Sequence, residues 1–89
     1  MPYHILPYSY NKARELGVEI KPSTRKDKKI DVYKNNNYIC SIGKIGMYDY
    51  PTYLRDKGVE YAQRRRYLFH KRFKNQTSLA SEYAKKILW

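Results

Sequence analysis

The sequence has few of the residues on which small enzymes, metal sites and disulfide-rich domains depend. It contains one cysteine, Cys40, so it can form no internal disulfide. Its two histidines, His4 and His70, lie far apart in the chain, and it has no CxxC, HxxxH or DxD pattern and no glycine-rich phosphate loop. We therefore expect no metal site, no cofactor and no catalytic activity.

Long apolar runs are also absent. The first ten residues, MPYHILPYSY, lack both the basic segment and the apolar stretch of a signal peptide. No segment stays apolar over the roughly 20 residues that a membrane-spanning helix needs. We expect a soluble protein, located inside a cell or a particle, with no membrane partner.

Acidic residues are scarce. Eight Asp and Glu stand against 19 Lys and Arg, which gives a formal net charge of +11, and such a field attracts polyanions. The charge is concentrated in two segments. Residues 21–34 hold six basic residues against Asp27 and Asp31, a net +4, and residues 55–74 hold eight against Asp56 and Glu60, a net +6.

The apolar content, 42% of 89 residues, is enough for one small domain over residues 1–89. The aromatic residues include 11 tyrosines, 2 phenylalanines and 1 tryptophan. Tyrosine can bury its ring while its hydroxyl reaches water or the backbone, which suits a thin core.

The first half of the chain predicts a helix followed by a β-hairpin. Residues 8–17 are expected to form a short helix with Ser9 as its N-cap and Gly17 just after its end. Residues 18–20 are compatible with a short third strand. A three-residue loop at residues 35–37 predicts the register of the hairpin, which pairs Val32 with Cys40 and Ile30 with Ile42 and puts all four on one face.

The second half predicts two helices. A long basic helix is expected from Asp49, its N-cap, to about Lys74, with Gly58 as its one weak point. A short closing helix begins at Thr77 or Ser78 and ends with Leu88 and Trp89. The predicted fold class is thus α+β: a short N-terminal helix, a β-hairpin that a third strand can extend, a long basic helix and a short C-terminal helix. We expect the core between the hairpin and the last two helices.

At 100° per residue, an apolar stripe on the basic helix contains Leu54, Tyr61 and Leu68. It is flanked by Gly58, Ala62 and Phe69. The opposite side, expected to face water, holds Arg64, Arg66, Tyr67, His70, Lys71 and Lys74. Arg65 and Arg72 fall inside the apolar stripe. They either extend out to solvent, pair with Asp31, Glu82 or the Trp89 carboxylate, or are reserved for a ligand.

This arrangement favours non-catalytic nucleic-acid binding with little sequence preference, because basic side chains meet phosphates and nothing here encodes base readout. The residues predicted to bind nucleic acid are Arg25, Lys26, Lys28, Lys29, Arg64, Arg65, Arg66, Tyr67, Lys71, Arg72 and Lys74. The alternative is a structural or scaffold protein that docks its basic face on an acidic protein surface. An exposed apolar patch beside the basic helix would favour that alternative.

Several blocks resemble a known group. They are YSYNKARELGV, KKIDVYKNNNYICSIG, YDYPTYLRDKG, YAQRRRYLFHKR and YAKKILW. Together they resemble a family of small, basic, uncharacterised proteins encoded by giant nucleocytoplasmic DNA viruses. The resemblance implies no activity, but it implies a setting, the host cytoplasm or nucleus or a virion. Members of this group carry Asn-Gly in the hairpin turn, where this chain has three asparagines.

Overall fold

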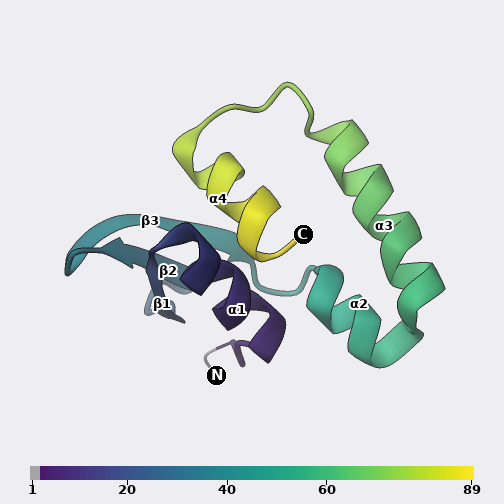
Figure 1. Cartoon of the computed structure of the whole chain (residues 1–89), viewed down its shortest axis with the longest axis horizontal. Helices are drawn as coiled ribbons and strands as arrows, with labels where there is room; N and C mark the ends of the chain where they lie inside the picture. The colour runs from purple at the N-terminus through teal and green to yellow at the C-terminus, as the bar shows by residue number, and fades with distance from the viewer. Residues whose placement is uncertain (1–2) are drawn as a thin grey trace.

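The helices and strands occur in the order expected of a small α+β fold. A computed structural model describes residues 3–89, and in that range a three-stranded antiparallel sheet follows the first helix and precedes three more, which confirms the predicted fold class. The elements, shown in Figure 1, are α1 (Pro7–Leu16), β1 (Glu19–Pro22), β2 (Lys28–Lys34), β3 (Asn37–Lys44), α2 (Tyr50–Lys57), α3 (Val59–Arg72) and α4 (Leu79–Ile87).

Helix α1 begins before its predicted N-cap. Pro7 lies in the first turn, where the missing N–H of proline is not needed. The prediction of Ser9 as N-cap is therefore wrong, because Ser9 lies within the helix and is buried. Its hydroxyl donates to the carbonyl of Ile87 at 3.0 Å and joins α1 to α4. Gly17 ends the helix with φ of 72°, as predicted.

The hairpin has the predicted register but a different turn. The loop has two residues, Asn35 and Asn36, with φ of 52° and 65°, instead of the predicted three. Positive φ at both central residues is what a tight hairpin turn requires, and asparagine tolerates it. A bulge then adds one residue on β3 between the partners of Val32 and Tyr33. Two turn residues and one bulged residue therefore give the same alternation as a three-residue loop.

The third strand is present as β1, slightly later in the chain than residues 18–20. It pairs antiparallel with β2, placing Ile20 opposite Val32 and Pro22 opposite Ile30. Pro22 is tolerated because it ends an edge strand, where a missing N–H breaks no interior ladder.

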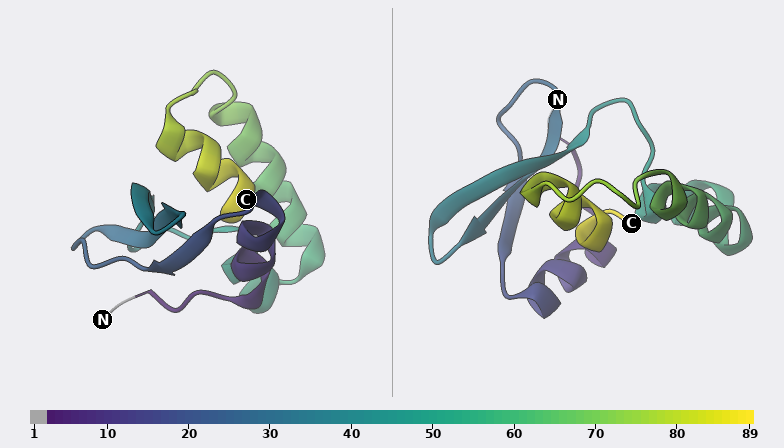
Figure 2. Two further views of the ribbon diagram at one scale, coloured as in Figure 1. Left: turned by 60° about the vertical axis from the view of Figure 1, so that its left-hand side comes forward. Right: turned by 90° about the horizontal axis from the view of Figure 1, so that it is seen from above.

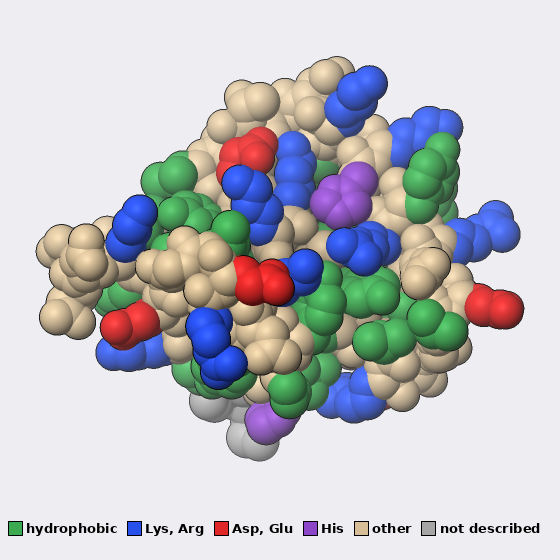
Figure 3. Space-filling view, in the orientation of Figure 1, with side chains coloured by type: hydrophobic (Ala, Val, Ile, Leu, Met, Phe, Trp, Pro, Cys, Tyr) green, Lys and Arg blue, Asp and Glu red, His purple; other side chains and the backbone are tan. Residues whose placement is uncertain are grey.

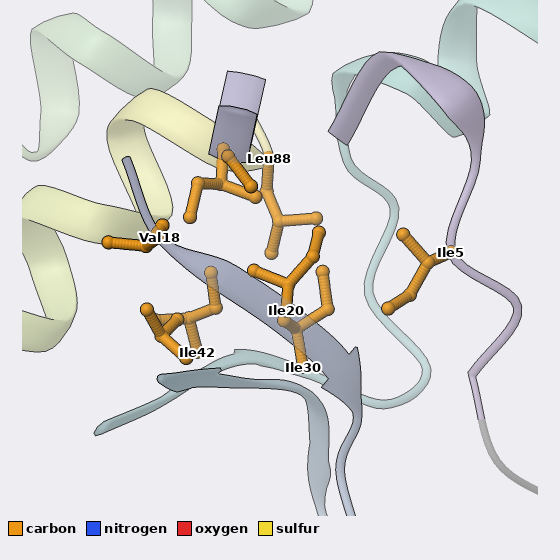
Figure 4. Close-up of a cluster of buried hydrophobic side chains, with 9 residues drawn as sticks. Ile5, Val18, Ile20, Ile30, Ile42 and Leu88 are labelled. Atoms are coloured by element: carbon orange, nitrogen blue, oxygen red, sulfur yellow. The ribbon is translucent and has the colours of Figure 1, made fainter. Parts of the chain in front are cut away.

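The core lies between one face of the sheet and helices α1 and α4. Figure 2 shows both helices on the same side of the sheet, and α2 and α3 lie farther out on that side, with α4 between them and the sheet. Figure 4 shows side chains of the sheet converging on Leu88. The buried cluster consists of Ile5, Ala13, Val18, Ile20, Ile30, Val32, Ile42, Ile87 and Leu88. The prediction that α4 packs on the sheet is confirmed. The prediction that α3 also does so is wrong, because α1 packs there instead.

The predicted long helix is two helices. Asp49 caps α2 as predicted, since its carboxylate accepts a hydrogen bond from the Thr52 N–H at 3.0 Å. Gly58 then adopts φ 93° and ψ 167°, a backbone conformation that glycine alone adopts readily. The chain changes direction there, and α3 packs back along α2. A helical stripe that spans Gly58 is therefore not continuous.

Asp31 on β2 is buried and provides a pH-dependent contribution to stability. Burial alone would raise the pKa of its carboxyl, but hydrogen bonds from Ser23, Ser41 and the Thr24 backbone, with the charge of Arg25, hold that pKa below its usual range. The Ser41 hydroxyl donates to the carboxylate at 2.6 Å. A lowered pKa in the folded state means that the stabilisation is present above the unfolded-state pKa of about 3.9 and is lost as the pH falls through the folded-state pKa.

We therefore expect Asp31→Asn to be less stable than the wild type at pH 7, and the difference to shrink below about pH 4. Urea unfolding of both proteins at several pH values between 7 and 3 measures this. Asp27→Asn, at an exposed turn position, is the control. If the stability difference between the two proteins stayed constant from pH 7 to pH 3, the ionised Asp31 carboxylate would not be its cause.

Candidate nucleic-acid interface

Helix α3 is rotated relative to the orientation that its sequence predicts. Its fully buried residue is Ala62, and Phe69 and Phe73 are half-buried beside it. The predicted core stripe is instead on the surface, because Leu54, Tyr61 and Leu68 are 37%, 46% and 41% exposed. The stripe was drawn through Gly58, where the helix breaks, so its heptad spacing does not describe one face.

Most of the side chains predicted to face water do so. Those that are exposed are Arg64, Tyr67, Lys71 and Lys74. Two predictions were wrong: Arg66 and His70 are half-buried. The guanidinium of Arg66 lies 4.9 Å from the ring centroid of Tyr50, so part of its binding capacity is used within the fold.

His70 adds no charge to this surface at pH 7. Burial lowers the pKa of its imidazole, and the positive charges of Arg66 and Lys85 lower it further, against a hydrogen bond with the Trp89 backbone that raises it. The ordinary pKa of histidine is about 6.5, so a lowered pKa leaves the ring neutral.

Arg65 and Arg72 are exposed rather than internally paired. Asp31 and Glu82, two of the carboxylates considered as partners, bind Ser41 and Lys85 instead. Within residues 3–89, no carboxylate lies within ion-pair distance of any basic side chain of α3. The guanidinium of Arg65 lies 5.5 Å from the centroid of Tyr53, and that of Arg72 lies 5.3 Å from the centroid of Phe73. Both charges are available to a ligand.

Both arginines line a partly open cavity of about 510 Å³ between α2, α3, α4 and residues 43–49. We call it the aromatic cavity. It is lined by Lys29, Gly43, Lys44, Met47, Tyr48, Asp49, Tyr53, Arg65, Leu68, Phe69, Arg72, Phe73, Ala84, Leu88 and Trp89. The sequence had indicated Arg65 and Arg72 as candidate ligand-binding residues, but it predicted neither the cavity nor the aromatic residues of its wall.

Contacting rings form much of the wall of the aromatic cavity. Phe69 and Trp89 stack with their centroids 4.3 Å apart and their planes within 6°. Tyr53 joins Trp89 to Tyr48, with centroid distances of 6.2 Å and 4.8 Å. Trp89 is held from the other side by α1 and α2. The Tyr8 hydroxyl donates to its carbonyl at 3.4 Å, and the Tyr50 N–H donates to the preceding carbonyl at 3.0 Å. The rings are thus in place before any ligand arrives.

Only some of the basic residues predicted to bind nucleic acid in and just after the β1–β2 turn are exposed. Arg25, Lys26 and Lys28 are exposed, as expected. Lys29 is not, because its side chain is 4% exposed and its ammonium lies 2.7 Å from the carboxylate of Asp49, which is 1% exposed. It also donates to the Met47 carbonyl. The prediction that Lys29 extends the exposed basic surface is wrong, because its charge is buried and paired with Asp49 inside the fold.

The two basic segments lie on opposite sides of residues 44–49. In the view from above in Figure 2, this segment lies between the β1–β2 turn and the α2–α3 unit. The Ile45 N–H donates to the Asp27 carbonyl at 2.9 Å, which fixes the loop against the turn. Figure 3 shows Lys and Arg side chains across α3 and α4 with few acidic ones between them. Two of the basic side chains of α3, Arg65 and Arg72, also line the aromatic cavity.

Other chemistry is sparse in the described part of the chain. Burial raises the pKa of the Cys40 thiol, and the nearby Asp31 raises it further, so the thiol stays protonated at neutral pH. From Tyr3 to Trp89, no three His, Cys, Asp or Glu side chains gather where they could bind a metal ion. No helix in the same range has the length and apolar character to cross a bilayer.

Comparison of this chain with family models, curated proteins and solved structures found no match. The fold and the site define the class of protein in physical terms: a small α+β domain with an aromatic cavity beside a basic helix that forms no ion pair among residues 3–89.

Proposed function

We propose that this protein binds nucleic acid without catalysing a reaction and with little sequence preference. The exposed basic side chains of α3 contact phosphates, and Arg25, Lys26 and Lys28 of the β1–β2 turn extend the contact. The observation that carries the proposal is the absence of ion pairs on α3 within residues 3–89, in a protein of net charge +11. Basic side chains that have no acidic partner within the protein can bind the phosphates of a polyanion, and this binding releases the counterions condensed on the polyanion.

The setting we propose is viral. The resemblance to small basic proteins of giant DNA viruses supports a protein associated with the genome, either in the infected cell or in the virion. A protein that packs or coats a genome needs affinity for phosphates more than base readout, which agrees with the exposed basic side chains of α3 and the β1–β2 turn.

The proposal predicts strong salt dependence. If four to six phosphates are contacted on duplex DNA, log Kd should change with log salt concentration with a slope of about 4 to 5 in magnitude, at about 0.9 per phosphate. Arg64→Ala with Lys71→Ala should reduce that magnitude by about 2, because each lost contact removes about 0.9. Fluorescence anisotropy with labelled DNA and RNA of mixed sequence, at several salt concentrations, measures the slope.

The matched control is Lys21→Ala with Lys34→Ala, which removes the same charge from exposed positions on the sheet. It should lower the affinity less and leave the slope close to that of the wild type. An unchanged slope in the Arg64 and Lys71 double variant would remove these two residues from the interface.

A second candidate function is supported by one observation. Exposed apolar side chains, namely Ile45, Met47, Tyr48, Leu54, Val59, Tyr61 and Leu68, lie on α2, α3 and the preceding loop, elements that also carry exposed basic side chains. The rings of Tyr48 and Tyr61 both pack on Tyr53, and grouped apolar side chains at a surface are typical of protein interfaces. This grouping favours a virion structural or scaffold protein that docks on an acidic protein surface. Loss of all nucleic-acid binding at near-physiological salt would favour this second function.

A further inference from the structure

We infer that the aromatic cavity receives one unstacked base of a single-stranded nucleic acid while Arg65 and Arg72 hold its backbone phosphates. This inference rests on the proposed function and specifies its substrate: a flexible single strand in preference to a duplex. Within a duplex every base is already stacked and paired, so it cannot enter a cavity without an energetic cost.

The size and the wall of the aromatic cavity suit a flat aromatic group. Its volume of about 510 Å³ lies within the range of roughly 300–1,000 Å³ typical of small-molecule sites. Its wall contains the stacked pair Phe69 and Trp89 together with Tyr48 and Tyr53. Single-strand binders use such rings as stacking platforms, because every base has a π-face whatever its identity.

The basic side chains around the aromatic cavity favour an aromatic ligand that carries negative charge. Arg65, Arg72 and Lys44 line it, are exposed and form no ion pair within residues 3–89. The one acidic residue of the lining, Asp49, is already neutralised by Lys29 at 2.7 Å. A neutral apolar ligand would leave these three charges unused, whereas a nucleotide carries both the ring and the phosphate.

The spacing of the two arginines fits a strand that crosses the cavity. They are seven residues apart on α3, so their positions are separated by about 10 Å along the helix axis at about 1.5 Å per residue. Leu68 and Phe69 lie between them and also line the cavity. A base inserted between the arginines leaves the backbone on either side within reach of a guanidinium.

The test compares three labelled probes with the same number of phosphates: a mixed-sequence single-stranded DNA, an abasic single strand and a duplex. We expect the base-containing single strand to bind about 5- to 150-fold tighter than the abasic strand, which corresponds to one stacked base. The sequence has one tryptophan, and it lines the cavity. Its fluorescence should therefore be quenched, to saturation, by the base-containing strand and not by the abasic one.

Leu68→Glu places a carboxylate in the cavity and should abolish both the preference for bases and the quenching. Gln63→Glu makes the same change in net charge at an exposed position of α3 that does not line the cavity and should keep both. Equal affinity for all three probes with no quenching of Trp89 would overturn the inference and leave the proposed function intact. No binding of any probe at near-physiological salt would overturn both. The wild-type quenching decides the question even if a variant fails to fold.

Discussion

Replacing Asp49 with alanine is expected to destabilise the protein by about 3–5 kcal/mol, the typical cost of removing one partner from a buried ion pair. The carboxylate accepts hydrogen bonds from the Lys29 ammonium and the Tyr3 hydroxyl, each at 2.7 Å, and from the Thr52 N–H at 3.0 Å. Without it the Lys29 charge stays buried with no counter-charge, and α2 loses its N-cap. Because small domains have total stabilities of about 5–15 kcal/mol, a loss of this size should be visible at once in thermal or urea unfolding.

Adding Lys29→Met to Asp49→Ala should recover part of the lost stability, because it removes the unpaired buried charge. Glu60→Ala, which removes an exposed carboxylate from the first turn of α3, is the control and should cost less than about 1 kcal/mol. If the double variant lost as much free energy of unfolding as Asp49→Ala and Lys29→Met lose together, the unpaired charge would not be the cause of the instability of Asp49→Ala.

Gly43→Ala should cost about 2–5 kcal/mol, from a backbone cost of about 1–2 kcal/mol and a crowding cost of about 1–3 kcal/mol. Gly43 has φ of 77°, in the left-handed region. A Cβ atom there would lie 2.8 Å from Cδ1 of Leu88 and 2.9 Å from Cδ of Lys29. Both of these side chains are buried, so neither can move away freely.

Gly17→Ala is the matched control for this prediction. Gly17 has nearly the same φ, 72°, but nothing lies within 4 Å of an added Cβ. It should show the backbone cost alone, about 1–2 kcal/mol. Comparison of the two variants by urea unfolding isolates the crowding beside Leu88, and equal losses would contradict it. Since Gly43 and Leu88 both line the aromatic cavity, Gly43→Ala should also alter the fluorescence of Trp89, whereas Gly17→Ala should not.

Local signals in the sequence predicted the elements well where one residue decides the local backbone. Asp49 caps α2 because a carboxylate there satisfies a free N–H of the first turn, and Gly17 ends α1 because glycine adopts positive φ without strain. The alternation of apolar residues on β2 and β3 predicted their pairing, because a shift by one residue would expose Ile30 and Val32. These predictions depend on near neighbours in the chain.

The candidate site was predicted less well, because it depends on which helix meets the sheet. α1 occupies the place beside α4, so α3 is left outside the main core. The apolar stripe of Leu54, Tyr61 and Leu68 therefore remains at the surface. No local pattern distinguishes an apolar stripe that packs on the core from one that lines a cavity.

By itself, the sequence determined the charge, the order of the elements and the register of the hairpin, since composition and short-range backbone preferences are properties of the chain. Only the tertiary structure decided the use of each charge. It buried Lys29 against Asp49, placed Arg66 over Tyr50 and left Arg65 and Arg72 exposed in the lining of the aromatic cavity. The physical reason is that burial and pairing depend on groups brought together from distant parts of the chain, and these distances are set by the packing of the whole fold.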